Sequence, residues 1–449
     1  MKQQIKQRIK QLNNDEIPDG YKKTEFGVFP CDWETDKTFG DLFDFYGGLS
    51  KSRDELGEEG YAYLHYGDLH RGSFNCVSLE QYSQLPKCDI ALKGKETCFM
   101  EDGDVAFLDA SEDLEGTSRA VLIDNPDNDP FIAGLHIIFG KSKDDSLEKW
   151  YKQYITSSES VKKQFQRLSV GFKVYGVNRD SLPKIRIAYP ASLQEQSRIA
   201  EILMKWDEAI DLYNRQIDQL KRFKSICLKK MFPLKGKTVP EWRFLQFTGA
   251  WEQRKLGDIA NIIDPHPSHR APAAVNEGIP FIGIGDVDAL GNIDKESART
   301  VEEAIYDEHH RRYNLDIPSL GIGRVASLGK VIRLRNDIGK YAVSPTMSII
   351  QFQDTVDIDY MYSCMESPIF QKQFASQSSG STRQSVGIQD LRELQVSIPK
   401  NEYEQKQIGR YFKEVDNLIT LHQRKVETAE KQRAVLQQYL LNGIVRVKK

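Results

Sequence analysis

The chain has 449 residues, of which 39% are hydrophobic and 28% are charged, and its formal net charge is −3. This length suffices for two or three domains, and the composition is typical of a soluble globular protein. The charge argues against a protein that coats nucleic acid non-specifically, because that binding usually requires a basic surplus. A protein that reads bases locally, while partner subunits supply part of the phosphate contacts, remains compatible with it.

The sequence contains no segment typical of secretion or of a membrane span. Its longest apolar run, residues 131–139, is interrupted by a glycine and a histidine. We therefore expect a cytoplasmic protein that does not contact a membrane. The six cysteines include no Cys-x-x-Cys pair, which favours buried thiols. A zinc site formed by Cys76, Cys88 and Cys98 is the weaker alternative.

The chain begins with a short amphipathic segment. Ile5, Ile9 and Leu12 recur at helical spacing within residues 1–14, so we expect a helix in an N-terminal arm, residues 1–20. This segment has no counterpart elsewhere in the chain. We expect it to pack against the end of the long helices that are described below.

Two sequence motifs of the first half return in the second half. WETDKTFGDL at residues 33–42 is matched by WEQRKLGDI at 251–259, and GYAYLHYGDL at 60–69 is matched by GIPFIGIGDV at 278–287. The second pair is typical of a strand that runs into a Gly-Asp turn. The chain is therefore an internal repeat.

Each repeat ends in an alternating segment closed by a proline, at residues 184–190 and 393–399. Alternation of apolar and polar residues predicts strands, and proline is unfavourable in a continuing strand. We expect two mixed, strand-rich domains: one at residues 21–190, and one within residues 233–400, after a linker.

A long amphipathic helix is predicted after each domain, at residues 191–232 and 401–449. Both begin with a Glu-Gln-x-x-Ile motif, and apolar residues then alternate at steps of four and three, the spacing of a coiled-coil seam. Lys224 and Arg433 interrupt this pattern at the same repeat position. The seam residues are Ile199, Leu203, Trp206, Ile210, Ile217 and Leu220 in the first helix, and Ile408, Phe412, Val415, Ile419, Val426 and Leu436 in the second.

The predicted helices are too long for packing on one small domain, since the first alone would extend about 55 Å. We therefore expect them to pair with each other. In the alternative, each lies on its own domain as an ordinary amphipathic helix.

The sequence carries no motif of a methyltransferase or a nuclease. Asp129 and Asp264 each precede a proline, but both lack the adjacent proline pair of a methyltransferase corner, and such dipeptides are common in turns. Arg324 stands where a phosphate-binding loop requires glycine. The only Glu-x-Lys, at residues 404–406, lies at a helix start, where helix capping explains the glutamate. The histidines have no metal-ligand spacing, and we expect residues 309–312 to form an exposed basic stretch.

The chain alternates two unlike globular units with two alike helices, and it carries the Trp-Glu, Gly-Asp and Glu-Gln-x-x-Ile motifs. In these features it resembles the type I restriction-modification specificity subunit over roughly residues 20–449. The resemblance implies an α+β fold with two target-recognition domains in a pseudo-twofold arrangement, separated by an antiparallel coiled coil. Each domain would read one half of a bipartite, asymmetric site on double-stranded DNA.

The resemblance also implies partners and their cofactors. Two modification subunits, which use S-adenosylmethionine, would dock on the helices, and restriction subunits would add activities that require ATP and Mg. The chain itself would be non-catalytic and would bind no cofactor or metal. A coiled-coil scaffold without a DNA role and a methyltransferase with an unrecognised site are the alternatives.

Polar and basic loop residues are the candidates for DNA contacts, because arginine can bind guanine and glutamine can bind adenine through two hydrogen bonds. For each of them, a solvated surface side chain is the alternative. Tyr61, Tyr63 and Phe281 are expected in the core rather than as stacking platforms. The candidates are Lys51, Arg53, His70, Arg71, Arg119 and Lys173 in the first domain, and His269, Arg270, Arg311, Arg312, Arg324, Arg383 and Gln384 in the second.

Overall fold

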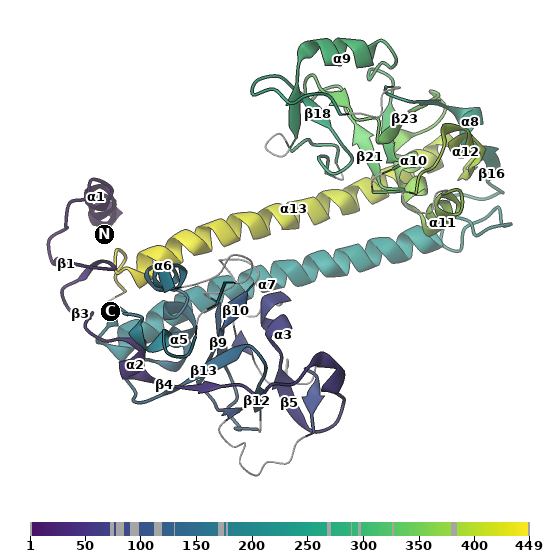
Figure 1. Ribbon diagram of the computed structural model, residues 1–449. Helices are drawn as coiled ribbons and strands as arrows, with labels where there is room; N and C mark the ends of the chain where they lie inside the picture. Colours follow the sequence, from purple (N-terminus) through teal and green to yellow (C-terminus); the bar gives the residue numbers. More distant parts are fainter. Residues whose placement is uncertain are drawn as a thin grey trace. The chain divides into compact units, whose positions relative to one another are not determined.

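The computed structural model divides the chain into two compact units, unit 1 with residues 1–210 and 428–449, and unit 2 with residues 211–427. Each unit contains one strand-rich domain and part of each of two long helices, α7 (Leu193–Lys230) and α13 (Glu402–Leu441) (Figure 1). The structure describes residues 2–71, 76–77, 85–89, 98–111, 119–129, 131–168, 175–176, 178–266, 271–288, 290–294, 298–325, 327–378 and 384–447.

The domain of unit 1 is built on two sheets. The larger has the order β4-β13-β9-β11-β6, and the smaller has the order β7-β5-β12-β8, in which β5 and β12 are parallel. The central strands of the larger sheet, β13, β9 and β11, are buried because their alternate residues belong to two different cores, one on each face. The strands are β4 (Phe43–Gly47), β5 (Tyr61–Leu64), β6 (Cys76–Val77), β7 (Lys87–Cys88), β8 (Phe99–Met100), β9 (Val105–Leu108), β11 (Ala120–Ile123), β12 (Phe131–Ala133) and β13 (Ile137–Ser142).

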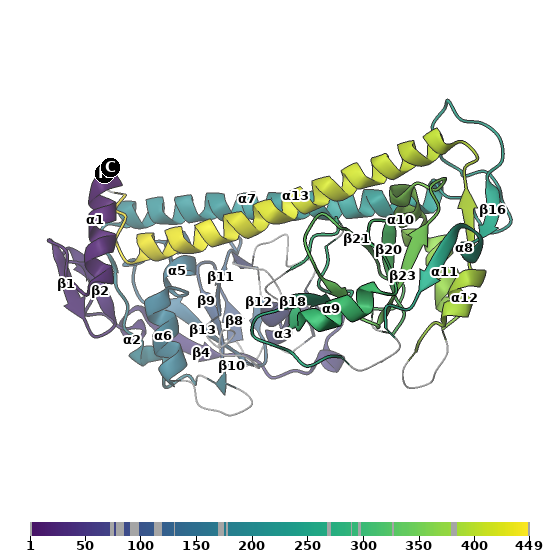
Figure 2. The same ribbon diagram turned by 90° about the horizontal axis from the view of Figure 1, so that it is seen from above.

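The domain of unit 2 repeats this plan. Its sheets have the orders β17-β23-β20-β21 and β19-β18-β22, and β18 and β22 are again parallel. Helix α10 (Ile358–Glu366) packs on β20 and β21 (Figure 2). The strands are β17 (Ala260–Ile263), β18 (Ile279–Ile282), β19 (Arg299–Val301), β20 (Ser319–Gly323), β21 (Val331–Leu334), β22 (Ala342–Val343) and β23 (Met347–Phe352).

Shorter elements complete the two units. Unit 2 has helix α9 (Glu303–His310) against β22, and β16 (Glu252–Lys255) pairs with β24 (Gln395–Ile398). The others are α1 (Lys2–Asn13), β1 (Tyr21–Thr24), β2 (Gly27–Pro30), β3 (Trp33–Glu34), α2 (Phe39–Leu42), η1 (Arg53–Glu55), α3 (Tyr66–Arg71), β10 (Ala110–Ser111), α5 (Lys149–Ile155), α6 (Glu159–Leu168), β14 (Tyr175–Gly176), η4 (Leu182–Lys184), β15 (Tyr189–Pro190), α8 (Leu256–Ile259), α11 (Pro368–Ser376) and α12 (Ile388–Glu393).

The two long helices run antiparallel and are joined within each unit by an ion pair. In unit 1, Asp207 near the start of α7 binds Arg433 near the end of α13 at 2.8 Å. In unit 2, Lys224 binds Asp416 at 2.6 Å and Glu366 of α10 at 2.5 Å. Lys224 and Arg433 are the two residues that interrupt the apolar seam, so each interruption carries a cation paired with a carboxylate of the opposite helix.

The predicted seam residues face inward, because every one of them is buried or half-buried. Ile199 and Leu203 join the core of unit 1 together with Leu440, whereas Ile408 and Phe412 join the core of unit 2. The two alternatives from the sequence therefore both hold in part. The helices pair with each other, and the beginning of each also packs on the domain that precedes it.

A buried glutamate anchors the start of each long helix. Glu195 accepts two hydrogen bonds from the guanidinium of Arg446, at 2.6 and 2.8 Å, and Glu404 accepts two from Arg243, at 2.7 and 2.8 Å. Glu404 also accepts a hydrogen bond from the indole Nε1 of Trp251 at 3.2 Å. The sequence predicted helix capping for Glu404, but in the structure both Glu404 and Glu195 bind an arginine of a neighbouring chain segment.

Helix α1 contacts the segment that follows α13, as expected. The Arg8 guanidinium donates a hydrogen bond to the carbonyl of Ile444 at 3.0 Å and lies over the ring of Tyr21. None of the helices in the described ranges is long and apolar enough to cross a membrane.

We predict that Lys224→Met lowers the free energy of unfolding by about 3 kcal/mol, because it leaves the carboxylates of Asp416 and Glu366 without the cation between them. Lys221→Met, at an exposed position one turn earlier on α7, removes the same charge and should change it by less than about 0.5 kcal/mol. Urea denaturation measures both values. Equal effects would show that the buried ion pair does not stabilise the protein.

Candidate nucleic-acid interface

Tyr63 of β5 joins two loops of the first domain. Its buried hydroxyl accepts hydrogen bonds from the backbone N–H of Lys51 at 3.1 Å and of Leu135 at 2.9 Å, and donates one to the carbonyl of Leu49 at 2.6 Å. Burial raises the pKa of Tyr63, so the hydroxyl keeps its proton. This placement confirms Tyr63 as a core residue and shows that it fixes the loops on either side.

A cluster of rings lies beside this junction, with Tyr66 and His136 exposed and His65 buried. We call His65, Tyr66, Asp109 and His136 the His136 cluster. His136, in the loop between β12 and β13, has a left-handed backbone with φ of 60°, and its Nδ1 lies 2.9 Å from the Asp109 carboxylate. The edge of Tyr66 meets the His136 ring at 5.5 Å, and Tyr66 packs on His65 at 4.4 Å. These rings are therefore held in a defined arrangement at the surface.

Three of the predicted DNA-contacting residues lie next to the His136 cluster. The backbone of Lys51 binds the same Tyr63 hydroxyl as the loop of His136, and the Lys51 side chain pairs with Glu55 at 2.8 Å. Arg53 pairs with Asp68, two residues after Tyr66, at 2.6 Å.

The third is Arg119, whose carbonyl binds the N–H of Leu108 beside Asp109. Burial lowers the pKa of Arg119. His70 and Arg71 end helix α3, whose first residue is Tyr66, but nothing is described of their side chains. Lys173 lies outside the described residues.

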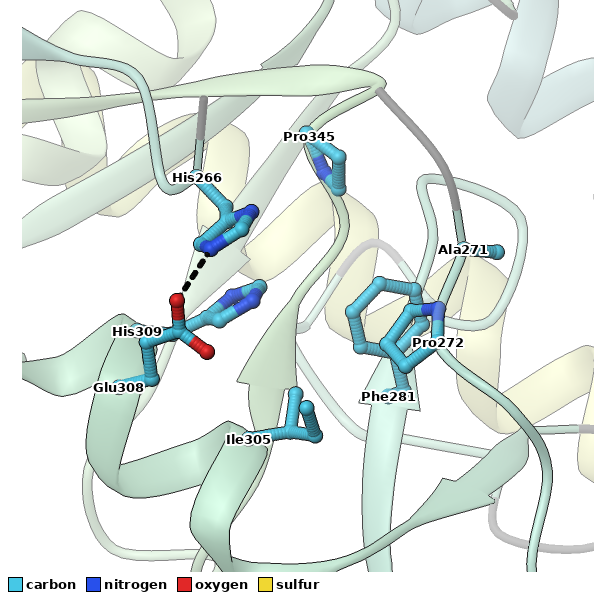
Figure 3. Close-up of a pocket in the computed structure, with 8 residues that line it drawn as sticks. All are labelled: His266, Ala271, Pro272, Phe281, Ile305, Glu308, His309 and Pro345. Carbon is cyan, nitrogen blue, oxygen red and sulfur yellow. Dashed lines mark hydrogen bonds and ion pairs between the residues drawn. The ribbon is translucent and has the colours of Figure 1, made fainter. Parts of the chain in front are cut away.

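The second domain has a cavity of about 240 Å³ at the corresponding end of its strands, where Phe281 takes the place of Tyr63 (Figure 3). The ring of His266 stacks parallel on that of His309 at 4.6 Å, and its Nε2 lies 2.8 Å from the Glu308 carboxylate. The cavity is lined by His266, Ala271, Pro272, Phe281, Ile305, Glu308, His309 and Pro345.

Two expectations for the second domain require correction. Arg324 is only 8% exposed and is paired with Asp264 at 3.1 Å, so it supports the loop from within and does not face solvent. His309 was expected in an exposed basic stretch, but it is buried against the carbonyl of Val343, and burial lowers its pKa. The sequence could not show this because α9 turns its His309 side towards β22.

Three of the six remaining candidates of the second domain lie within the described residues. Arg311, Arg312 and Gln384 are exposed, and Arg312 donates a hydrogen bond to the carbonyl of Asp264 at 3.1 Å. These three residues stay predicted DNA contacts. The predictions for His269, Arg270 and Arg383 fall outside the described residues.

Sequence reasoning missed Tyr66, Asp109 and His136. Tyr66 was visible only as part of the Gly-Asp motif, and His136 only as an interruption in an apolar run. Their proximity depends on the parallel pairing of β5 with β12, a long-range contact with no local signal. Across the described parts of the chain, no group of three His, Cys, Asp or Glu side chains could hold a metal ion. Cys88 and Cys98 are buried.

The sequence matches the family described as the type I restriction modification DNA specificity domain at residues 30–222 and 249–431. A Methanocaldococcus jannaschii protein, provisionally described as the MjaX type I restriction enzyme specificity subunit, is 23% identical over 96% of this chain and 97% of its own length. The MjaVIII specificity subunit of the same organism is 25% identical over 66% of this chain and 70% of its own length.

Solved structures share the fold. The S subunit of a type I restriction-modification system from M. genitalium superposes with a TM-score of 0.56 at 15% identity, covering 91% of this chain and 96% of that one. At this identity, the likeness concerns the arrangement of the chain.

We predict that Tyr63→Phe lowers the free energy of unfolding by about 1–3 kcal/mol, because two backbone N–H groups and a carbonyl lose their buried partner. Tyr61→Phe, on the same strand and half-buried, should change it by less than about 0.5 kcal/mol. Chemical denaturation of both variants measures the difference. An equal, small effect would mean that the Tyr63 hydroxyl does not hold the loops.

Proposed function

Since the chain belongs to the family of type I restriction-modification DNA specificity proteins, we propose that it is the non-catalytic subunit that selects the DNA site of such an enzyme. Each domain reads one half of a bipartite, asymmetric site on double-stranded DNA. The observation that carries this proposal is that two domains with the same backbone plan present different side chains at the same end of their sheets.

The backbone equivalence is supported by matching hydrogen bonds. In unit 1, the N–H of Asp109 binds the carbonyl of His136 at 3.1 Å, and in unit 2 the N–H of Arg324 binds the carbonyl of Thr346 at 2.9 Å. The side chains at these positions differ: Asp109 and His136 form a pair at the surface of one domain, whereas in the other Arg324 is buried against Asp264 and Thr346 is half-buried. Different donors and acceptors on equivalent loops suit two different half-site sequences.

Exposed apolar residues on the helices support two equivalent docking sites. Leu212 and Leu421 occupy the same repeat position and are 50% and 48% exposed, and Ile226 and Val435 form a second such pair at 47% and 49%. A surface that the repeat preserves twice suits two copies of one partner, and we assign these sites to two modification subunits.

The proposed complex supplies the chemistry that this chain lacks. Modification subunits bind S-adenosylmethionine and methylate the DNA, whereas restriction subunits use ATP and Mg. The complex acts in the cytoplasm, where its DNA substrate is found. The near-neutral charge of this chain agrees with a division of labour in which partners provide part of the phosphate contacts.

We predict that the purified chain alone transfers no methyl group to DNA and cuts no DNA, and that methylation appears when its modification subunits are added. Transfer from labelled S-adenosylmethionine to plasmid DNA measures the activity, and sequencing of methylated positions should show one bipartite, asymmetric site. Turnover by the chain alone, or methylation without sequence preference, would contradict the proposed function.

We also predict that Leu212→Asp and Leu421→Asp each remove one of two bound modification subunits, and that the double variant removes both, because a charge in an apolar interface is left without a partner. Native mass spectrometry of the complexes counts the subunits. Asn214→Asp, an exposed position on α7, adds the same charge and should leave two. Loss of both subunits from either single variant would contradict two independent sites.

A further inference from the structure

We infer that His136 is a specificity-determining residue that accepts a hydrogen bond at its Nε2 from the exocyclic amino group of one base, adenine N6 or cytosine N4, in the first half-site. The inference rests on the proposed function, because it names the contact by which the first domain distinguishes bases.

The partner of His136 defines which ring nitrogen is available. A carboxylate can only accept, so the Asp109 carboxylate at 2.9 Å favours the tautomer in which Nδ1 carries the proton. Nε2 then carries the lone pair and acts as an acceptor. In the major groove, adenine and cytosine present amino donors, whereas guanine O6 and thymine O4 are acceptors that would oppose this lone pair. The ring therefore distinguishes A and C from G and T.

The orientation of the ring is fixed before any ligand arrives. His136 has a left-handed backbone, which a non-glycine residue keeps only where its surroundings impose it and which is frequent at ligand sites. Asp109 holds one nitrogen, and the edge of Tyr66 meets the ring at an interplanar angle of 88°. The His136 side chain is nevertheless 44% exposed. A fixed, accessible acceptor is what direct readout requires.

Basic side chains lie on the same surface, where they could contact the phosphates on either side of a base. Lys51 and Arg53 flank the cluster through the Tyr63 junction and through Asp68. Both are paired with carboxylates in the free protein, and these pairs can be exchanged for phosphate contacts. The surface thus combines a fixed acceptor with basic side chains, and the two types of side chain suit base readout and phosphate contact respectively.

The second domain lacks this feature at the equivalent position. Thr346 takes the place of His136 there, and its hydroxyl lies 3.0 Å from the Ser344 hydroxyl, within the same loop. The effect of changing His136 should therefore be confined to one position of the first half-site.

The test uses His136→Gly in the complete complex with modification subunits. Glycine is favoured at a left-handed position, so the variant should keep or raise the melting temperature while it loses the ring. His136→Asn, a residue that also tolerates this backbone, is the second variant. Asn128→Gly is the matched control, since Asn128 is another left-handed residue of this domain and contacts the N–H of Asp102 at the opposite end of β9.

A library of randomised sites, read by methylation sequencing, measures preference at every position. We expect His136→Gly to reduce discrimination at a single A or C position of the first half-site about tenfold, with the second half-site unchanged. Asn128→Gly should match wild type. His136→Asn should retain a preference for adenine, which its amide can bind.

Synthetic DNA then tests the chemical group. Wild-type methylation should fall about tenfold when the identified base is replaced by an analogue without its amino group, and His136→Gly should show no further fall on that DNA. Unchanged preference in His136→Gly, a uniform loss on all sequences, or a change in the second half-site would overturn the inference. If wild type itself methylates without a bipartite preference, the proposed function fails, and that result is distinguishable from all of these.

Discussion

The reciprocal ion pairs between the long helices are the constraint on which the rest of the structure depends. Asp207 with Arg433, and Lys224 with Asp416, place a cation of one helix against a carboxylate of the other at equivalent repeat positions. Hydrophobic residues alone would tolerate several helix registers, since any shift by one heptad keeps an apolar seam. A shifted register would separate each partly buried charge from its partner, which costs far more than an exposed pair gains.

That register also determines what the start of each helix can do. Because Ile199 and Ile408 belong to the cores of their own units, a helix cannot slide without disturbing a domain. The buried glutamates at 195 and 404 add a second restraint through arginines from neighbouring segments. The register of the two helices, which form the framework of the protein, is thus fixed by several independent interactions. A protein that must present surface loops reproducibly benefits from such a framework, because loop positions follow from it.

The two domains differ in the side chains at the ends of their sheets. Tyr63 holds its neighbouring loops by hydrogen bonds, whereas Phe281 at the equivalent position borders a cavity beside stacked imidazoles. The strands that correspond in the two domains have the same order, while the side chains at the sheet ends differ. Two reading surfaces can therefore diverge without changing the cores. This separation of scaffold from surface agrees with a specificity protein whose two halves recognise different sequences.

The sequence by itself determined the repeat, the two long helices and the seam. Recurring motifs and the spacing of apolar residues can be read along the chain without knowledge of its contacts. It also indicated Lys224 and Arg433 as interruptions, but not their partners, since Asp207 and Asp416 lie on the opposite helix. Only the tertiary structure decided that Arg324 is buried. Only it joined Asp109 to His136, because contacts between distant strands, and the backbone conformation that they impose, leave no local pattern in the chain.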